Sequence, residues 1–361
     1  MQTAVISGTG LWIPPHIITN HELVESFNQW VATQPEGLPS SVEFVEKASG
    51  IERRYVVDKV GVLDPTRMKP RIEERPDDEW SLQCEICCQA AREAMEQARL
   101  QAEDIDGVIV GCSNLQRAYP AVAVEVQKAL GCSGWAYDMN VACSSATFAL
   151  ANATQSVQSG FARRVLIVNP EITSAHLNFR DRDSHFIFGD ACTALVVEEQ
   201  SGCQAPETWQ ILDCQLATQF SNNIRNNFGF LNRCHEERAQ DPDKLFRQNG
   251  RAVFKEVVSM VSRQLQGQLQ RLGLASVRRF WLHQANRHMN DLIAKMVLGR
   301  ESTLDEAPVI LNEFANTSSA GSVIAFHRHR QDMKSGEVGV MCSFGAGYSV
   351  GSVVLKKKNP S

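Results

Sequence analysis

The sequence predicts an α/β protein that consists of two copies of one α/β unit, and three observations support this prediction. Apolar runs typical of buried strands alternate along the chain with long helical patterns. The two longest helical patterns carry apolar residues at helical spacing on one face. Three pairs of motifs recur in the same order in the two halves of the chain.

The first unit contains the clearest strand signals. Residues 1–8 lack the basic region and cleavage signal of a secretory leader, so we expect the first strand there. A helix over about 78–100 should precede a buried strand at 106–111. The apolar runs 165–168 and 194–197 predict two further strands.

The second unit repeats this order around a helix expected over about 251–272. The repeated pairs are 106–114 with 278–286, 137–143 with 309–316, and 188–191 with 344–347. The polar stretch 199–206 ends in proline and separates the copies. We therefore expect a first unit over 1–200 and a second unit over 206–361.

Composition excludes several classes of protein. The chain has 361 residues and a formal net charge of -5, which argues against binding of nucleic acid through bulk positive charge. Its apolar runs are too short to predict a transmembrane helix, and we expect no membrane association. The 11 cysteines are odd in number and scattered, which favours reduced thiols and a cytoplasmic location.

Three residues at the ends of strand-like runs are candidates for catalysis. Cys143 lies between an extended run and a stretch of small residues, so a strand-to-helix turn would place its sulfur at a helix N-terminus. His283 follows an apolar run and precedes a helical pattern, and Asn316 occupies the position in the second unit that Cys143 has in the first. Taken singly, each could be a structural residue, but a thiol, an imidazole and an amide together suit acyl transfer through a thioester.

Other signals have simpler interpretations. The CxxC motif at Cys84 and Cys87 lies inside an amphipathic helix, where core packing is favoured over zinc binding. Arg247, Arg251 and Lys255 would share one helical face, and alone they indicate a solvated surface.

At these motifs the sequence resembles the thiolase superfamily and, within it, the β-ketoacyl-ACP synthase III group. The resemblance runs nearly end to end and rests on residues 8–10, 49–54, 118–120, 140–143, 188–190, 283–286, 316–318 and 344–347. It implies a five-layered α-β-α-β-α fold of two similar halves, usually assembled as a homodimer. It implies no metal and no organic cofactor.

The resemblance also assigns roles to residues of this chain. Cys143 would take an acyl group from an acyl-CoA. His283 and Asn316 would bind the malonyl thioester carbonyl and stabilise the enolate that forms on decarboxylation. The backbone amides of Cys143 and Ala346 would form the oxyanion hole. The segment after His283 resembles a docking site for the acyl carrier protein (ACP), and with Lys255 it gives the expected ACP-binding residues Lys255, Gln284, Arg287 and His288.

Several positions depart from the housekeeping pattern, which is primed by acetyl-CoA. Phe44 stands where that pattern has a tryptophan that stacks on the CoA adenine, and alanines replace two arginines of the same clamp, at Ala48 and Ala175. Arg251 replaces an asparagine that contacts pantetheine, and Tyr119 matches an aromatic residue that lines the partner's acyl pocket. Together with a charged, proline-containing surface excursion at 58–78, these departures favour a medium-chain primer such as octanoyl-CoA, giving β-ketodecanoyl-ACP.

Alternative functions remain open on the sequence. They are an acetyl-CoA-primed housekeeping synthase, a head-to-head long-chain acyl condensing enzyme, a non-decarboxylating thiolase, and a non-catalytic acyl-carrier-binding protein. A thiolase would need a second cysteine as acid and base, and Cys342 lies near the required place. Asn316 argues against the elongating synthases, which use two histidines.

Overall fold

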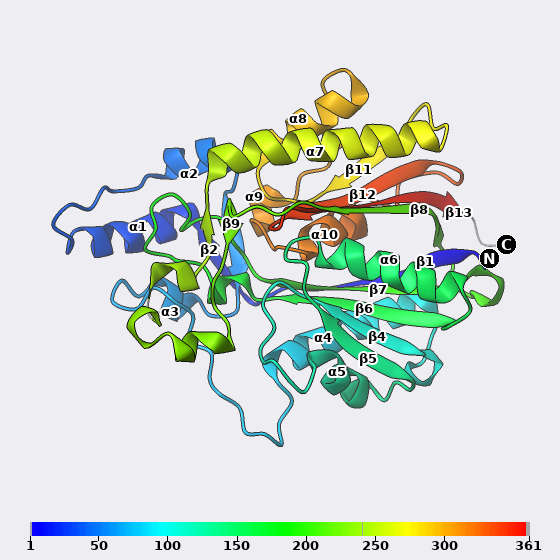
Figure 1. Ribbon diagram of the computed structural model, residues 1–361, viewed down its shortest axis with the longest axis horizontal. Coiled ribbons are helices and arrows are strands. Elements are labelled where there is room, and N and C mark those ends of the chain that lie inside the picture. The colour runs from blue at the N-terminus through cyan, green and yellow to red at the C-terminus, as the bar shows by residue number, and fades with distance from the viewer. Residues whose placement is uncertain (1, 240, 359–361) are drawn as a thin grey trace.

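The computed structural model describes residues 2–239 and 241–358, and its strands form a long mixed sheet (Figure 1). The strand order is β11-β12-β13-β8-β1-β7-β6-β4-β5. The bounds are β1 Ala4–Trp12, β4 Gly107–Gly111, β5 Trp135–Met139, β6 Arg164–Glu171, β7 Ala191–Glu199, β8 Thr208–Thr218, β11 Arg279–Leu282, β12 Val338–Gly345 and β13 Ser349–Lys358. The strands expected at the N-terminus and around 106–111, 165–168 and 194–197 are therefore confirmed, although Met1 lies outside the described residues.

The sheet consists of two half-sheets that repeat one pairing pattern. In the first half, β4 and β6 are parallel, while β6, β7 and β1 follow as antiparallel neighbours. In the second half, β11 and β12 are parallel, while β12, β13 and β8 follow as antiparallel neighbours. The halves meet through two residue pairs between β1 and β8, Val5 with Gln210 and Ile6 with Trp209. The predicted duplication is thus present in the backbone.

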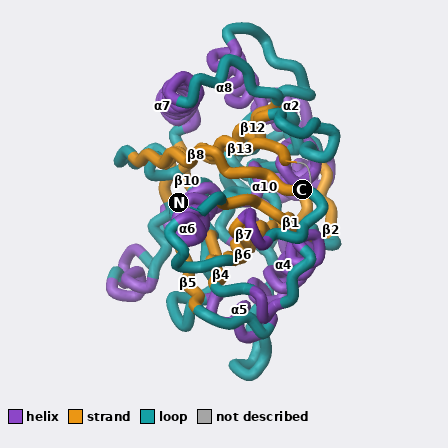
Figure 2. Tube along the Cα trace, turned by 90° about the vertical axis from the view of Figure 1, so that its right-hand side faces the viewer, coloured by secondary structure: helices purple, strands orange, loops and turns teal. Residues whose placement is uncertain are grey.

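Helices cover both half-sheets and separate them, which gives the five predicted layers (Figure 2). The helices α4 (Leu82–Ala98) and α5 (Val122–Leu130) form one outer layer, and α7 (Gly250–Arg271) and α8 (Arg287–Leu298) form the other. Between the half-sheets lie α6 (Ser145–Gln158) and α10 (Ala320–Arg328). Three separate apolar clusters correspond to the two outer interfaces and to this central layer.

Close packing of α4 on β1 explains two of the sequence motifs. A Cβ atom at Gly8 or Gly10 would lie 1.9 Å from a backbone oxygen of α4, so only glycine fits at these positions. On the inner face of α4, the side chains of Cys84 and Cys87 are fully buried among apolar residues. The glycine pair and the CxxC motif therefore serve core packing, as expected for the CxxC motif.

A smaller cap is added at one end of the first half. It contains β2 (His16–Thr19), α1 (Asn20–Val31), α2 (Val42–Ser49), β3 (Arg53–Val56) and α3 (Lys59–Leu63), which share an apolar cluster of their own. The excursion at 58–78 is only partly a surface feature. Val62 on α3 and Met68, just after the turn that follows α3, are buried in that cluster. Its remainder, from about 71 onward, forms the exposed loop that extends away from the body in Figure 1.

Some boundaries differ from the sequence predictions. Asn249 caps α7 through its side chain, and Arg247 lies before the helix in the short strand β10 (Arg247–Gln248), paired with β9 (Ile224–Arg225). Arg247 therefore does not share a helical face with Arg251 and Lys255, and that prediction was wrong. The connection between β7 and β8 coincides with the expected junction at 199–206. The division into units 1–200 and 206–361 itself stays a prediction.

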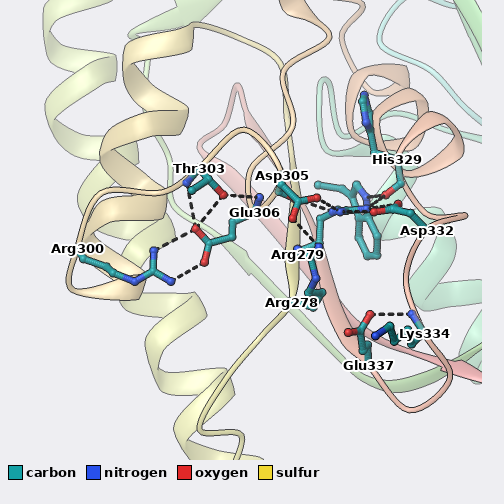
Figure 3. Close-up of polar contacts among 11 residues, drawn as sticks. Arg278, Arg279, Arg300, Thr303, Asp305, Glu306, His329, Asp332, Lys334 and Glu337 are labelled. Atoms are coloured by element: carbon teal, nitrogen blue, oxygen red, sulfur yellow. Dashed lines mark hydrogen bonds and ion pairs between the residues drawn. The ribbon is translucent and has the colours of Figure 1, made fainter.

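A buried arginine paired with two surface aspartates fixes the first residue of β11 (Figure 3). The guanidinium of Arg279 donates to both carboxylate oxygens of Asp332, at 2.6 and 2.8 Å, and also binds Asp305. The indole of Trp281 donates to the carbonyl oxygen of His329 at 2.9 Å. Removal of both aspartates would leave the buried guanidinium without a carboxylate partner, so the two pairs together hold this end of the strand.

Within the described residues, no helix is long and apolar enough to cross a membrane.

Candidate active site

The Cys143 turn connects β5 to α6, as the sequence predicts. The side chain of Asn140 accepts a hydrogen bond from the Ala142 amide at 2.9 Å, and the Ser145 hydroxyl accepts from the Val141 amide at 2.9 Å. Ala142 has a φ of 48°, a left-handed conformation that costs about 1–3 kcal/mol for a residue with a Cβ atom. This sharp turn places the sulfur of Cys143 two residues before the first residue of α6.

The Asn316 turn repeats this geometry in the second half. It follows the short helix α9 (Leu311–Phe314), and Ala315 has a φ of 55°, matching Ala142. The backbone N–H of Asn316 donates to the carbonyl oxygen of Ile187 at 2.9 Å. The side-chain oxygen of Asn316 accepts from the backbone N–H of Ser318 at 2.9 Å. The side-chain orientation is therefore set by the backbone, with the amino group turned away from Ser318.

His283 follows the last residue of β11 directly. Its backbone N–H donates to the carbonyl oxygen of Cys342 at 2.8 Å, and its ring meets the ring of Phe344 edge to face at a centroid distance of 5.2 Å. Burial lowers the pKa of His283 to about 4, although the backbone of Ser318 acts in the opposite direction. The imidazole is thus neutral at pH 7, and its Nδ1 has no hydrogen-bond partner within the described chain.

Ser318 and Gly345 connect the Cys143 turn to the Asn316 segment and to the end of β12, where Phe344 contacts the ring of His283. The Ser318 hydroxyl donates to the Cys143 sulfur at 3.5 Å. A Cβ atom at Gly345 would lie 2.7 Å from the Cβ of Cys143, so the last residue of β12 must be glycine for the strand to approach the thiol this closely.

The environment of Cys143 opposes ionisation of the resting thiol. Burial raises the pKa of Cys143 to about 11, and the negative charge of Glu171 adds to this effect. A hydrogen bond from Ser318 and the backbone amides of Cys143 and Ala346 lower that pKa. These two amides are the groups that the sequence predicts for an oxyanion hole.

Glu171 lies at the end of β6 and was missed by sequence reasoning. Its carboxylate accepts from the Ser113 hydroxyl at 2.6 Å and from the hydroxyl and amide of Ser319. Burial raises the pKa of Glu171, while the serine hydrogen bonds oppose that shift. An isolated glutamate at a strand end gives no sequence signal, because its partners come from loops distant in the chain.

The expected ACP-binding residues do not all reach the surface. Lys255 and Arg287 are exposed, and His288 contacts the carbonyl oxygen of Lys47 at 3.2 Å. Gln284 is fully buried within the chain, and its part in ACP binding stays a prediction. Its side-chain amino group donates to the carbonyl oxygen of Leu282, and its side-chain oxygen accepts from the backbone amides of Ile310 and Leu311 at the start of α9. These bonds connect the His283 segment to the Asn316 segment.

The expected acyl and CoA residues lie on different elements of the chain. Phe44 is half-buried on α2, and the guanidinium of Arg182 lies 4.2 Å above its ring. Arg182 supplies a positive charge near Phe44 that the alanines at Ala48 and Ala175 cannot, and sequence reasoning missed it. Arg251 is exposed in the first turn of α7, and Tyr119 is 85% exposed on the loop before α5.

The surroundings of Cys342 argue against a role as the second cysteine of a thiolase. Its side chain is fully buried in the apolar cluster beneath α7 and α8, and burial raises the pKa of the thiol well above its ordinary value. Among the described residues, no group of three or more His, Cys, Asp or Glu side chains is arranged to hold a metal ion.

The duplicated five-layered fold and the convergence of Cys143, His283 and Asn316 define a condensing enzyme of the thiolase type. Comparison with known proteins narrows this class. Residues 137–219 match the family model for 3-oxoacyl-(acyl-carrier-protein) synthase III, and residues 268–357 match the model for its C-terminal part.

The chain is similar to curated relatives over most of its length. It is 60% identical to a β-ketodecanoyl-(acyl-carrier-protein) synthase of Pseudomonas aeruginosa, covering 88% of this chain and 91% of the relative. It is 30% identical to a β-ketoacyl-(acyl-carrier-protein) synthase III of Cereibacter sphaeroides, covering 98% of each. A crystal structure of 3-oxoacyl-(acyl carrier protein) synthase III from P. aeruginosa matches with a TM-score of 0.79, 22% identity and full coverage of both chains.

The chain belongs to the β-ketoacyl-ACP synthase III family and is an acyltransferase of the condensing type. The resemblance inferred from the sequence, the fold class and the reaction class are thereby confirmed.

Proposed function

We propose that this enzyme condenses a medium-chain acyl-CoA with malonyl-ACP and releases a β-ketoacyl-ACP, with octanoyl-CoA giving β-ketodecanoyl-ACP. The observation that carries the proposal is the Cys143, His283 and Asn316 site, taken with the 60% identity to a β-ketodecanoyl-ACP synthase. Phe44, Ala48 and Ala175 replace the residues that hold the CoA adenine in the housekeeping pattern. These replacements support selection of the primer through its acyl chain. Each buried methylene contributes about 0.8 kcal/mol, so six more carbons outweigh one weakened CoA contact.

Cys143 is the nucleophile in this mechanism. Its thiolate attacks the acyl-CoA carbonyl, and the amides of Cys143 and Ala346 stabilise the oxyanion that forms. Two observations support these roles: the sulfur lies at the start of α6, and both amides lower the pKa of the thiol. Fixed donors of this kind act where charge develops and need no reorganisation during the reaction.

His283 and Asn316 act on the second substrate. The Nε2 of neutral His283 and the amino group of Asn316 donate to the malonyl thioester carbonyl, which becomes the enolate oxygen as carbon dioxide leaves. The low pKa of His283 supports this role, because the imidazole is neutral at the pH of the reaction. The enolate then attacks the acyl group on Cys143, and the thiol is released.

A primer series tests the proposal. Intact-mass analysis with acyl-CoA thioesters from acetyl to tetradecanoyl should show one acyl group on the wild type and none on Cys143→Ala. With malonyl-ACP, kcat/KM should be higher for octanoyl-CoA than for acetyl-CoA. Preference for acetyl-CoA would favour the housekeeping alternative, and an unchanged adduct in Cys143→Ala would remove Cys143 from the mechanism.

We also propose that two copies of the chain associate through β5. This strand is the edge of the sheet, and it pairs with β4 on one side. Beside it, Tyr137 and Phe161 are 38% and 71% exposed and stack on either side of Trp135. An exposed edge with an apolar surface is a site for strand addition, and such a dimer would place the exposed Tyr119 close to the partner.

The dimer has a direct test. Tyr137→Lys should weaken association by adding a charge to the apolar edge, and sedimentation velocity should show a shift from dimer to monomer. Lys128→Glu, on the exposed face of α5, is the matched charge control and should leave the dimer unchanged. A monomeric wild type, or a variant as dimeric as the wild type, would contradict association through β5.

We place the enzyme in the cytoplasm. All 11 cysteines are free, which fits a reducing compartment, and malonyl-ACP and acyl-CoA would be its substrates there.

A further inference from the structure

Ser318 contacts the surroundings of each residue that we assign to catalysis. Its hydroxyl donates to the sulfur of Cys143 at 3.5 Å, and its backbone N–H donates to the side-chain oxygen of Asn316 at 2.9 Å. Its backbone also raises the pKa of His283 against the effect of burial. The residue is 1% exposed, so its hydroxyl is directed into the site and not into solvent.

The backbone at Ser318 is strained in a way that glycine would relieve. Its φ of 49° is left-handed, a conformation that costs a residue with a Cβ atom about 1–2 kcal/mol. The adjacent Ser319 holds the turn by donating to Glu171 through its hydroxyl and its amide. A serine at a position suited to glycine indicates that the hydroxyl contributes something that glycine could not.

Among the groups of the described chain that shift the pKa of Cys143 most, none is a cation. Glu171, at the end of β6, raises the pKa of the thiol. His283, after β11, is neutral because burial lowers its pKa to about 4. The groups that favour the thiolate are therefore the Ser318 hydroxyl and the amides of Cys143 and Ala346.

We propose that Ser318 is a further catalytic residue, whose hydroxyl donates to the Cys143 sulfur and stabilises the thiolate that attacks the acyl thioester. The proposal rests on the proposed role of Cys143 as nucleophile. In this step the bond between Sγ and the acyl carbon forms, and the bond between that carbon and the CoA sulfur breaks. The proton lost by Cys143 leaves with CoA as its thiol, and Ser318 keeps its own proton.

The contribution of Ser318 is specific to the reactive state. A thiolate is a much stronger hydrogen-bond acceptor than a thiol or a thioester sulfur. The hydroxyl therefore stabilises the attacking sulfur more than the resting enzyme or the acyl-enzyme, which is the condition for faster acylation.

Alkylation of Cys143 by iodoacetamide, measured by peptide mass against pH, tests this role without any substrate. Ser318→Ala and Ser318→Gly should both move the midpoint of alkylation upward by about one pH unit, equivalent to a ~10-fold smaller thiolate population at a given pH. Ser318→Gly suits the left-handed backbone, so it preserves the turn if the alanine variant does not fold. Acylation by octanoyl-CoA should slow by about tenfold in both.

Ser322→Ala is the matched control, because Ser322 is a buried serine on α10 that hydrogen-bonds to Ser343 at 2.7 Å. Its alkylation midpoint should equal that of the wild type. An unchanged midpoint in Ser318→Gly would overturn the proposal, as would a shift confined to Ser318→Ala, which would point to the backbone. Failure of wild-type Cys143 to accept an acyl group would instead contradict the proposed function and leave the alkylation result as the test of Ser318.

Discussion

At the scale of single residues, two strained alanines precede two of the residues that we assign to catalysis. Ala142 precedes Cys143 and Ala315 precedes Asn316, with φ values of 48° and 55°. Each conformation costs about 1–3 kcal/mol and persists only where the surroundings fix it. Side-chain caps fix the first turn, and a hydrogen bond to Ile187 fixes the second. The two halves therefore share a strained turn of the same kind, which carries a thiol in the first half and a side-chain amide in the second.

The roles of His283 and Asn316 can be separated from that of Cys143. In His283→Ala or Asn316→Ala, we expect acyl-Cys143 to form at close to the wild-type rate. Decarboxylation of malonyl-ACP should fall by about 10²–10³-fold, because each change removes one donor to the enolate oxygen. Release of carbon dioxide from labelled malonyl-ACP measures this step, and wild-type rates in both variants would contradict the assignment.

The sequence singled out these residues because each follows an apolar run and opens onto a turn, although the run before Asn316 forms the short helix α9 and not a strand. It could not identify Ser318 or Glu171, because their importance depends on contacts between segments that are distant along the chain. The contact of Ser318 with Cys143 spans 175 positions, and that of Ser319 with Glu171 spans 148. Periodicity describes one element at a time and does not report such contacts.

At the scale of elements, the N-terminal parts of α7 and α8 carry three exposed basic residues, Arg251, Lys255 and Arg287. We call these residues the basic surface. Asn286 caps α8 with its side-chain oxygen and donates to the carbonyl oxygen of Ala48, so α8 rests on the end of α2. Gln284, two residues before Asn286, is instead held inside the chain by the backbone amides of Ile310 and Leu311.

The basic surface should matter more for ACP than for small substrates. Lys255→Glu or Arg287→Glu should raise the KM for malonyl-ACP several-fold at low ionic strength, because exposed charges act mainly through the rate of encounter. Added salt should remove most of the difference. Lys128→Glu on α5 is the control and should leave this KM unchanged. Equal losses with a small malonyl thioester would show that the surface does not receive ACP.

At the scale of the whole molecule, the two repeated halves could be predicted from the sequence, but the cap on the first half could not. Alternation of strands and helices predicts both halves, because buried parallel strands carry continuous apolar runs. The cap of α1, α2 and α3 was not predicted, since short elements with their own apolar cluster lack a sustained period. That cap and the central layer bury several histidines, which ties the stability of the molecule to pH.

Four histidines are expected to destabilise the fold in acid. Burial lowers the pKa of His176, His185, His283 and His327 to about 4 in each case. An unfolded histidine titrates near pH 6.5, so the unfolded chain binds more protons between about pH 6.5 and 4. Their contribution to stability is present above that window and is lost as the pH falls through it. Asp190 acts in the opposite direction, because burial raises its pKa to about 6.

His176 isolates this effect. Its ring nitrogens have no hydrogen-bond partner within the described chain, and the ring lies 5.3 Å from that of Phe188. His176→Phe should match the wild type near pH 7 and exceed it by about 2 kcal/mol in unfolding free energy near pH 4.5, because phenylalanine cannot bind the proton. Urea unfolding across this range measures the difference. His21→Asn, at an exposed position on α1, should follow the wild-type curve. If the unfolding free energy of His176→Phe changed with pH in the same way as that of the wild type, His176 would be protonated as readily in the folded chain as in the unfolded one.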